Sequence, residues 1–270
     1  MQINDQDGIG RRALILATLS ASAGAVLPSW AFAARGNAVP ILAYHRFDRA
    51  RPGSTTVTIP TLTSQLRQLV EHDYRVVALR DAIAALRQRR PDAPRLAAIT
   101  VDDGHRSVYD LLYPLLRERR LPATVFVYPS AISNADYAMT WDQLREMEGS
   151  GLVDVQSHTY WHPNFNTERR RRSADGFRAF VDDQLMRSKA TIEKRLGNKV
   201  DQLAWPFGIV DADLEAAARR AGYAAALAYE GGPATADSDL LALPRIPIGD
   251  ADRGAQFAAK IAAPSTAPLK

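Results

Sequence analysis

Two kinds of segment alternate along most of the sequence, and this alternation limits the folds that the chain can adopt. Short apolar or β-branched runs, typical of buried strands, are separated by segments with helical periodicity. We expect strands at Val39–Tyr44, Tyr74–Ala78, Leu96–Val101, Ala123–Tyr128, Leu152–Ser157, Gln202–Trp205, Ala224–Tyr229 and Leu243–Ile248. We expect helices at Thr61–His72, Leu79–Arg89, Ser107–Arg119, Thr140–Glu148, Ala174–Leu196, Ala212–Ala221 and Ala255–Ala262. Seven or eight such βα units with short linkers predict a single α/β domain built as a parallel barrel.

Residues typical of helix ends support these limits. Asp81, Ser107 and Asp211 stand near helix starts, where a side-chain oxygen can accept from free backbone N–H groups. Gly197 and Gly222 follow helix ends, where glycine tolerates the left-handed conformation.

The N-terminus resembles a secretory signal. Arg11 and Arg12 precede a mild apolar run over Ala13–Leu27, and Ala31-Phe32-Ala33 places small residues before a cleavage point. We therefore predict a signal peptide over residues 1–33, either of the general secretory type or of the twin-arginine type. An uncleaved anchor is the alternative. A folded domain over residues 34–262 and a flexible tail over 263–270 would follow. The expected location is the periplasm or envelope of a bacterium.

Cysteine is absent from the 270 residues, and only five histidines are present. Disulfides, thiolate zinc sites, iron–sulfur clusters and cysteine nucleophiles are thereby excluded. Any transition metal must be held by histidine and carboxylate side chains.

The chain carries a formal net charge of +4, with a dense basic run over Arg169–Arg172. This run is either a solvated helix end or a docking patch for an anionic polymer or a membrane surface. No recognition motif accompanies it, so we do not expect nucleic acid as a partner. The sequence carries no sign of the oligomeric state.

Chemically active side chains follow several of the predicted strands, as expected at the catalytic end of a parallel barrel. Asp102-Asp103-Gly104 comes directly after Leu96–Val101. One carboxylate could bind a metal while the other takes a proton, or the pair could simply cap the next helix.

Two histidines follow another strand. His158 and His162 are four residues apart, which on a helical turn would place both on one face. Together with Asp103 they would form a hydrolytic metal site with an open position, which suits Zn²⁺ and also fits Co²⁺, Ni²⁺ or Fe²⁺. The alternative is a surface histidine pair.

A third strand end reads Trp205-Pro206-Phe207-Gly208. Proline followed by an aromatic residue and glycine can direct a backbone N–H toward a pocket. Trp205 and Phe207 could offer ring faces to a sugar, or Trp205 could belong to the core.

These motifs resemble the polysaccharide deacetylases of carbohydrate esterase family 4, the NodB-homology domain. The resemblance covers roughly residues 39–250 and rests on the order and spacing of the three strand-end motifs. Further likeness at Tyr44–Phe47, Met139–Leu144 and Leu243–Ile246 points to the branch of biofilm poly-N-acetylglucosamine deacetylases.

The resemblance implies a distorted (β/α)7 barrel, one divalent metal and an N-acetylated glycan substrate. It implies that Asp102 is the general base and that the backbone N–H of Phe207 stabilises the oxyanion. The metal ligands would be Asp103, His158 and His162. Trp161, Trp205, Pro206 and Phe207 would contact the sugar.

The sequence departs from most of the family at two positions, and the biofilm branch shares both departures. Ala204 stands where an arginine usually orients the base, and no histidine follows His162 to protonate the leaving amine. Arg245 could replace the arginine, or it could form an unrelated ion pair. His45 ranks first as the acid because it follows the first strand, ahead of His72 and His105; Asp102 or metal-bound water could also serve.

The predicted function is metal-dependent removal of N-acetyl groups from an extracytoplasmic polysaccharide similar to poly-N-acetylglucosamine. Peptidoglycan, chitin oligomers or an O-acetyl ester are alternative substrates. A glycan-binding module with an impaired site is the alternative from another class.

Overall fold

The computed structural model of the protein describes residues 38–88 and 94–262. The predicted signal over residues 1–33 and the tail over 263–270 lie outside the described residues. In the described part, no helix is both long enough and apolar enough to cross a lipid bilayer.

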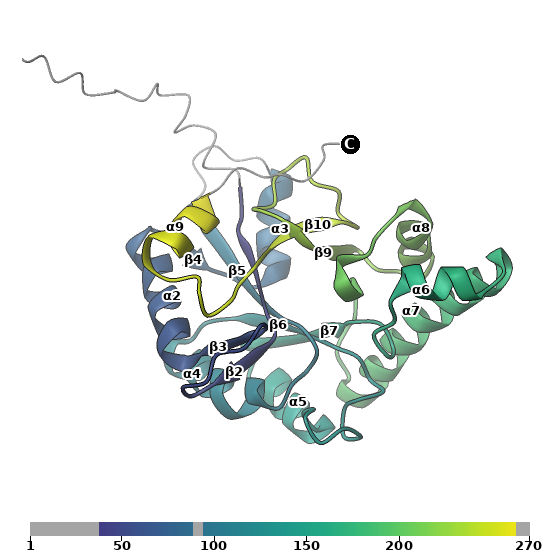
Figure 1. Ribbon diagram of the computed structural model, residues 1–270, viewed down its shortest axis with the longest axis horizontal. Coiled ribbons are helices and arrows are strands. Elements are labelled where there is room, and N and C mark those ends of the chain that lie inside the picture. Colours follow the sequence, from purple (N-terminus) through teal and green to yellow (C-terminus); the bar gives the residue numbers. More distant parts are fainter. Residues whose placement is uncertain (1–37, 89–93, 263–270) are drawn as a thin grey trace, which may run out of the picture.

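Seven parallel strands form a closed barrel surrounded by helices (Figure 1). The order around the ring is β1-β10-β9-β8-β7-β6-β5, and pairing of β5 with β1 closes it. The ring strands are β1 (Ile41–Tyr44), β5 (Leu96–Val101), β6 (Ala123–Val127), β7 (Val153–Ser157), β8 (Gln202–Ala204), β9 (Ala225–Gly231) and β10 (Leu243–Pro247). The predicted barrel is therefore confirmed.

The predicted strand at Tyr74–Ala78 is shorter and does not belong to the ring. It forms β4 (Arg75–Val76), which pairs only with β5. Two further strands were not predicted, β2 (Arg46–Asp48) and β3 (Thr56–Thr58), and they pair with each other. Three-residue strands carry too little periodic pattern to be identified from sequence.

The helices lie within one or two residues of the predicted limits, with two exceptions. They are α2 (Ile59–Glu71), α3 (Leu79–Gln88), α4 (Tyr113–Arg119), α5 (Trp141–Gly149), α6 (Phe165–Arg171), α7 (Ala174–Leu196), α8 (Ala212–Arg220) and α9 (Gly254–Ala262). Helix α6 was not predicted, and the predicted helix over Ser107–Arg119 begins with a π-helical segment at Val108–Leu112.

Capping behaves as expected at three of these ends, including the end of α8, after which Gly222 has φ of 78°. The Asp211 side chain accepts from the N–H of Leu214 at the start of α8, and Gly197 ends α7 with φ of 76°. Ser107 does not cap a helix; its hydroxyl accepts from the backbone N–H of Phe47.

Strand periodicity determines which side chains enter the barrel. Ala98, Thr100 and Asp102 alternate along β5 and its end, so they share one face. Ala98 packs in the interior cluster with residues from other strands, among them Phe126 and Leu243, whereas the intervening residues pack toward the helices. The barrel interior is thus apolar toward the amino ends of the strands and polar toward their carboxyl ends.

Candidate active site

Asp103, His158 and His162 come together at the carboxyl ends of β5 and β7. One ligand atom from each lies within 4.8 Å of the other two. Nε2 of His158 and Nε2 of His162 lie 3.6 and 3.7 Å from Oδ1 of Asp103. The structure therefore places the three predicted metal ligands together.

The two histidines do not reach this arrangement through a helical turn, as the spacing suggested. Thr159 and His162 have φ of 64° and 65°, so the segment between the histidines folds as an irregular loop. Pro163 follows His162 and disfavours helical geometry there. The loop nevertheless brings the two rings within 4.6 Å of each other, centroid to centroid.

The residues fit a divalent cation. Ligand distances of about 2.0–2.2 Å place tetrahedral ligand atoms roughly 3.4 Å apart, close to the separations found here. Nδ1 of His158 donates to the carbonyl oxygen of Ala204 at 2.7 Å, which leaves Nε2 as the coordinating atom. Burial, followed by the neighbouring His158, lowers the pKa of His162 to about 4, so its imidazole is neutral and able to coordinate.

Asp102 lies beside this triad but has a different partner. Arg245 donates to both of its carboxylate oxygens, at 2.8 and 2.7 Å, and the two residues are 1% and 0% exposed. Burial acts to raise the pKa of Asp102, but the charge and hydrogen bonds of Arg245 outweigh it and hold that pKa well below its ordinary value. The carboxylate thus stays ionised.

The backbone separates the two neighbouring carboxylates. Asp102 continues the inward face of β5, whereas Asp103 has φ of 73° and Gly104 has φ of 69°. This left-handed turn redirects the side chain of Asp103 toward the histidines. A Cβ on Gly104 would lie 3.0 Å from Cδ1 of Ile132 and 3.1 Å from Cγ1 of Val127, so the tight turn also suits glycine.

His45 lies at the end of β1, among the charged groups of the site. Burial lowers its pKa, while Asp102 and Asp103 act in the opposite direction. Its ring meets that of Tyr229 edge to face at 5.4 Å. Tyr229, in β9, was not predicted as a site residue, although its position at the end of an expected strand was a signal that could have identified it.

The turn after β8 depends on Tyr229 as well. Phe207 and Gly208 have φ of 56° and 69°. A Cβ on Gly208 would lie 2.7 Å from Cβ and 2.9 Å from N of Tyr229, so only glycine allows this approach. The ring of Phe207 is 60% exposed and lies 4.6 Å from that of His162.

The prediction that Trp205 contacts a sugar is wrong. Trp205 is completely buried, its Nε1 donates to the carbonyl oxygen of Leu241 at 2.8 Å, and its ring packs against Phe165. The side chain of Pro206 is buried as well. Trp161, by contrast, is 41% exposed and directly precedes His162 of the triad.

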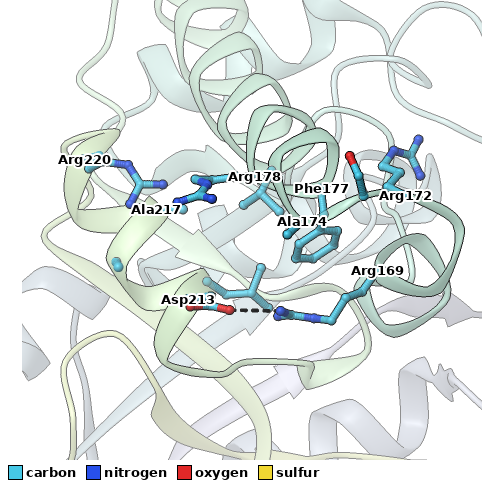
Figure 2. Close-up of a pocket in the computed structure, with 12 residues that line it drawn as sticks. Arg169, Arg172, Ala174, Phe177, Arg178, Asp213, Ala217 and Arg220 are labelled. Carbon is cyan, nitrogen blue, oxygen red and sulfur yellow. Dashed lines mark hydrogen bonds and ion pairs between the residues drawn. The ribbon is translucent and has the colours of Figure 1, made fainter.

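The basic run Arg169–Arg172 covers the last turn of α6 and the residue after it, next to a separate cavity of about 470 Å³ between α6, α7 and α8. Figure 2 shows Arg169 reaching Asp213 beside the ring of Phe177. Arg172 pairs with Glu168. Arg171 also pairs with Glu168, at 3.6 Å. Three of the four arginines are therefore matched by carboxylates, and docking through this run stays a prediction.

A parallel barrel with two imidazoles and paired carboxylates at its carboxyl end is the arrangement expected of a hydrolase that could hold one metal ion. The sequence profile of the polysaccharide deacetylase family matches residues 89–226. The chain belongs to this family of polysaccharide deacetylases.

Individual relatives agree with this assignment. The chain is 24% identical over 199 residues to the poly-β-1,6-N-acetyl-D-glucosamine N-deacetylase of Staphylococcus epidermidis, covering 72% of this chain and 68% of the relative. Two solved structures share the fold. The deacetylase PplD of Streptococcus pyogenes has a TM-score of 0.73 with 23% identity, covering 83% of this chain and 98% of that one. IcaB from Ammonifex degensii has a TM-score of 0.72 with 24% identity, covering 85% and 99%.

Proposed function

We propose that this protein is an exported, metal-dependent N-deacetylase that acts on N-acetylglucosamine units of a polysaccharide similar to poly-β-1,6-N-acetylglucosamine. The observation that carries the proposal is that two neighbouring carboxylates have different partners. Asp102 is held by Arg245 inside the barrel, while Asp103 faces His158 and His162. Likeness to the staphylococcal enzyme supports the substrate class.

Asp103, His158 and His162 would hold one divalent cation, with Zn²⁺ the first choice for two imidazoles and a carboxylate. When bound, such a cation lowers the pKa of water and polarises a carbonyl oxygen. Co²⁺, Ni²⁺ and Fe²⁺ fit the same ligands.

The remaining steps fall to the protein's own groups. Asp102 accepts a proton from the water that adds to the acetamide carbonyl carbon, and its low pKa lets it release that proton again. The backbone N–H of Phe207 donates to the carbonyl oxygen as negative charge develops there. The C–N bond then breaks, and the proton taken up by Asp102 reaches the leaving nitrogen either directly or through His45, giving acetate and an amine.

Export rests on the predicted signal over residues 1–33, which would place the enzyme in the periplasm or envelope. The run Arg169–Arg172 would dock on an anionic polymer or lipid surface there; the side chain of Arg171 is 70% exposed. Sedimentation with anionic but not neutral vesicles, lost on changing Arg170 and Arg171 to serine, tests this docking.

The main test is acetate release by the metal-reconstituted protein from β-1,6- and β-1,4-linked N-acetylglucosamine oligomers and from an O-acetylated xylan. We expect the β-1,6-linked oligomers to be hydrolysed with the highest kcat/KM. Release only from the β-1,4-linked oligomers or from the ester would replace the proposed substrate. No release from any of them would overturn the proposal.

A further inference from the structure

A second cavity opens beside the triad. It has a volume of about 400 Å³, in the range of small-ligand sites. Its walls come from the segment after β6, with Tyr128, Ser130, Asn134 and Tyr137, and from the segment after β7, with Trp161 and His162. His162 thus belongs both to this cavity and to the triad.

We propose that this cavity binds the sugar residue next to the one being deacetylated, and that it accepts that residue only in its neutral, N-acetylated form. The inference rests on the proposed function and adds a specificity to it: a free amine at the neighbouring position blocks the reaction.

The position of the cavity supports its role as a neighbouring subsite. The backbone N–H of Ser130 donates to the carbonyl oxygen of Tyr160 at 3.0 Å and joins the two segments that form the walls. The ring of Tyr128 lies 5.5 Å from that of His162. A sugar chain whose reacting acetamide meets the triad would therefore extend directly into this cavity.

The walls offer aromatic surface suited to a sugar ring. Tyr137 and Trp161 are 42% and 41% exposed, and both are among the few large hydrophobic side chains of the described residues that face solvent. Aromatic residues with one polar end are typical of surfaces that bind amphipathic ligands. The hydroxyl groups of Tyr128 and Tyr137 share a hydrogen bond of 2.6 Å, which fixes both rings.

The polar groups of the cavity are neutral. The amide nitrogen of Asn134 donates to the carbonyl oxygen of Ser130 at 3.0 Å, so its side-chain oxygen remains available as an acceptor. The Ser130 hydroxyl adds a donor and an acceptor. Ala131 and Ala135 complete the wall with small apolar groups that suit an acetamide methyl.

No Asp, Glu, Lys or Arg is among the residues that line the cavity. An ammonium group would therefore lose part of its hydration there without gaining a carboxylate partner, which disfavours its binding. The charged side chains that act on Tyr128 are Asp103, a proposed metal ligand, and Arg46, and neither of them lines the cavity.

The consequence concerns the pattern of the product. Each reaction leaves a glucosamine with an ammonium group, and that residue would then be rejected by the cavity. Amines should accordingly be dispersed along the polymer and not gathered in blocks.

The test compares three N-acetylglucosamine pentamers: one fully acetylated, and two with a single glucosamine on one or the other side of the central residue. Acetate release and mass-spectrometric sequencing give kcat/KM at the central residue. We expect a glucosamine on one side to lower kcat/KM at least tenfold more than on the other. Equal rates with all three pentamers, equal losses on both sides, or faster reaction beside an amine would overturn the proposal.

A charge variant assigns the effect to this cavity. Ser130→Asp places a carboxylate among the neutral walls, and Ser130→Asn is the uncharged control of similar size. We expect the aspartate to reduce the discrimination against the amine about tenfold and the asparagine to preserve it. Unchanged discrimination in Ser130→Asp would exclude the cavity as its source.

Failure of the subsite and failure of the proposed function give different results. Acetate release without discrimination overturns the subsite alone, whereas no release from any pentamer overturns the proposed function. In the second case, calorimetric binding of the same pentamers to the wild type and Ser130→Asp still tests the subsite. Equal affinity for acetylated and amine-containing pentamers would then overturn it.

Discussion

Arg245 holds Asp102 through two hydrogen bonds in the interior of the barrel, although the two residues are 143 positions apart in the sequence. Arg245 also donates to the carbonyl oxygen of Ala228 and to the hydroxyl of Thr100. The guanidinium is thus held on three sides. The family's usual arginine is absent at Ala204, and Arg245 supplies a cation to Asp102, the proposed base, from a different strand.

Removing this arginine should impair both folding and activity. Arg245→Met leaves a buried carboxylate without a counter-ion, which we expect to cost about 3–5 kcal/mol of unfolding free energy. Loss of the oriented base should lower kcat/KM by about 10²–10⁴-fold. Arg245→Lys retains the charge but not the two hydrogen bonds to the carboxylate, so its stability and its kcat/KM should lie between those of the wild type and Arg245→Met. Urea unfolding and acetate release measure the two effects; a fully active Arg245→Met protein would contradict the assigned role.

Base and metal ligands should separate in a metal-binding experiment. We expect Asp102→Asn to lower activity by about 10²–10⁴-fold while retaining one equivalent of bound metal, since Asp102 faces Arg245 and not the histidines. His158→Ala should lose metal and activity together. His72→Ala, outside the triad, is the control. Plasma mass spectrometry measures the metal content of each variant and so separates a lost base from a lost metal ligand. Turnover by a metal-loaded Asp102→Asn protein would exclude Asp102 as the base.

The turn after β8 can be tested with a matched pair of glycines. Gly208→Ala combines φ of 69° with a Cβ only 2.7 Å from Cβ of Tyr229, whereas Gly197→Ala has φ of 76° and no atom within 4 Å. Each change should cost about 1–2 kcal/mol from backbone strain. Only Gly208→Ala should cost more than this and also lower kcat, because the turn must move away from Tyr229. Equal effects in thermal unfolding and kinetics would show that the contact is unimportant.

The two tryptophans near the site should respond in opposite ways. Trp205 is completely buried, so Trp205→Ala should lower the unfolding free energy by about 3–5 kcal/mol. Trp161→Ala, at a 41% exposed side chain, should change stability by less than about 1 kcal/mol but raise KM for oligomers. Unfolding curves and KM values together separate the core residue from the substrate contact. An unchanged KM in Trp161→Ala would remove Trp161 from the substrate-binding residues.

Glu148 should make stability depend on pH. Burial raises its pKa to about 7, against the effect of the Val155 N–H that donates to it at 2.7 Å. Because the folded-state pKa is raised, the folded state binds more protons than the unfolded state between about pH 4.5 and 7, and stability falls as pH rises through this range. We expect a loss of about 2 kcal/mol, reduced by partial exposure. Glu148→Gln should flatten this dependence in urea unfolding; an unchanged slope would assign it to another group.

The local pattern of the chain was sufficient for the barrel and for the residues that follow its strands. Apolar runs such as Leu96–Val101 are buried on both faces in a parallel sheet, so each strand is visible in its own composition. The rule that chemistry lies at the carboxyl ends then brought Asp102, Asp103, His158 and His162 to one end.

The tertiary structure decided how distant segments lie relative to one another and in which direction individual side chains point. The pairing of Arg245 with Asp102, the burial of Trp205 and the cavity that joins Asn134 to His162 depend on which strand lies beside which, and local periodicity does not encode this. The left-handed turns at Asp103 and His162 likewise oppose local propensity and are held by the surrounding contacts. The sequence by itself determined the class of fold and the kinds of reactive group. Which of these groups contact one another was decided only when the barrel closed, because closure sets which strands are neighbours.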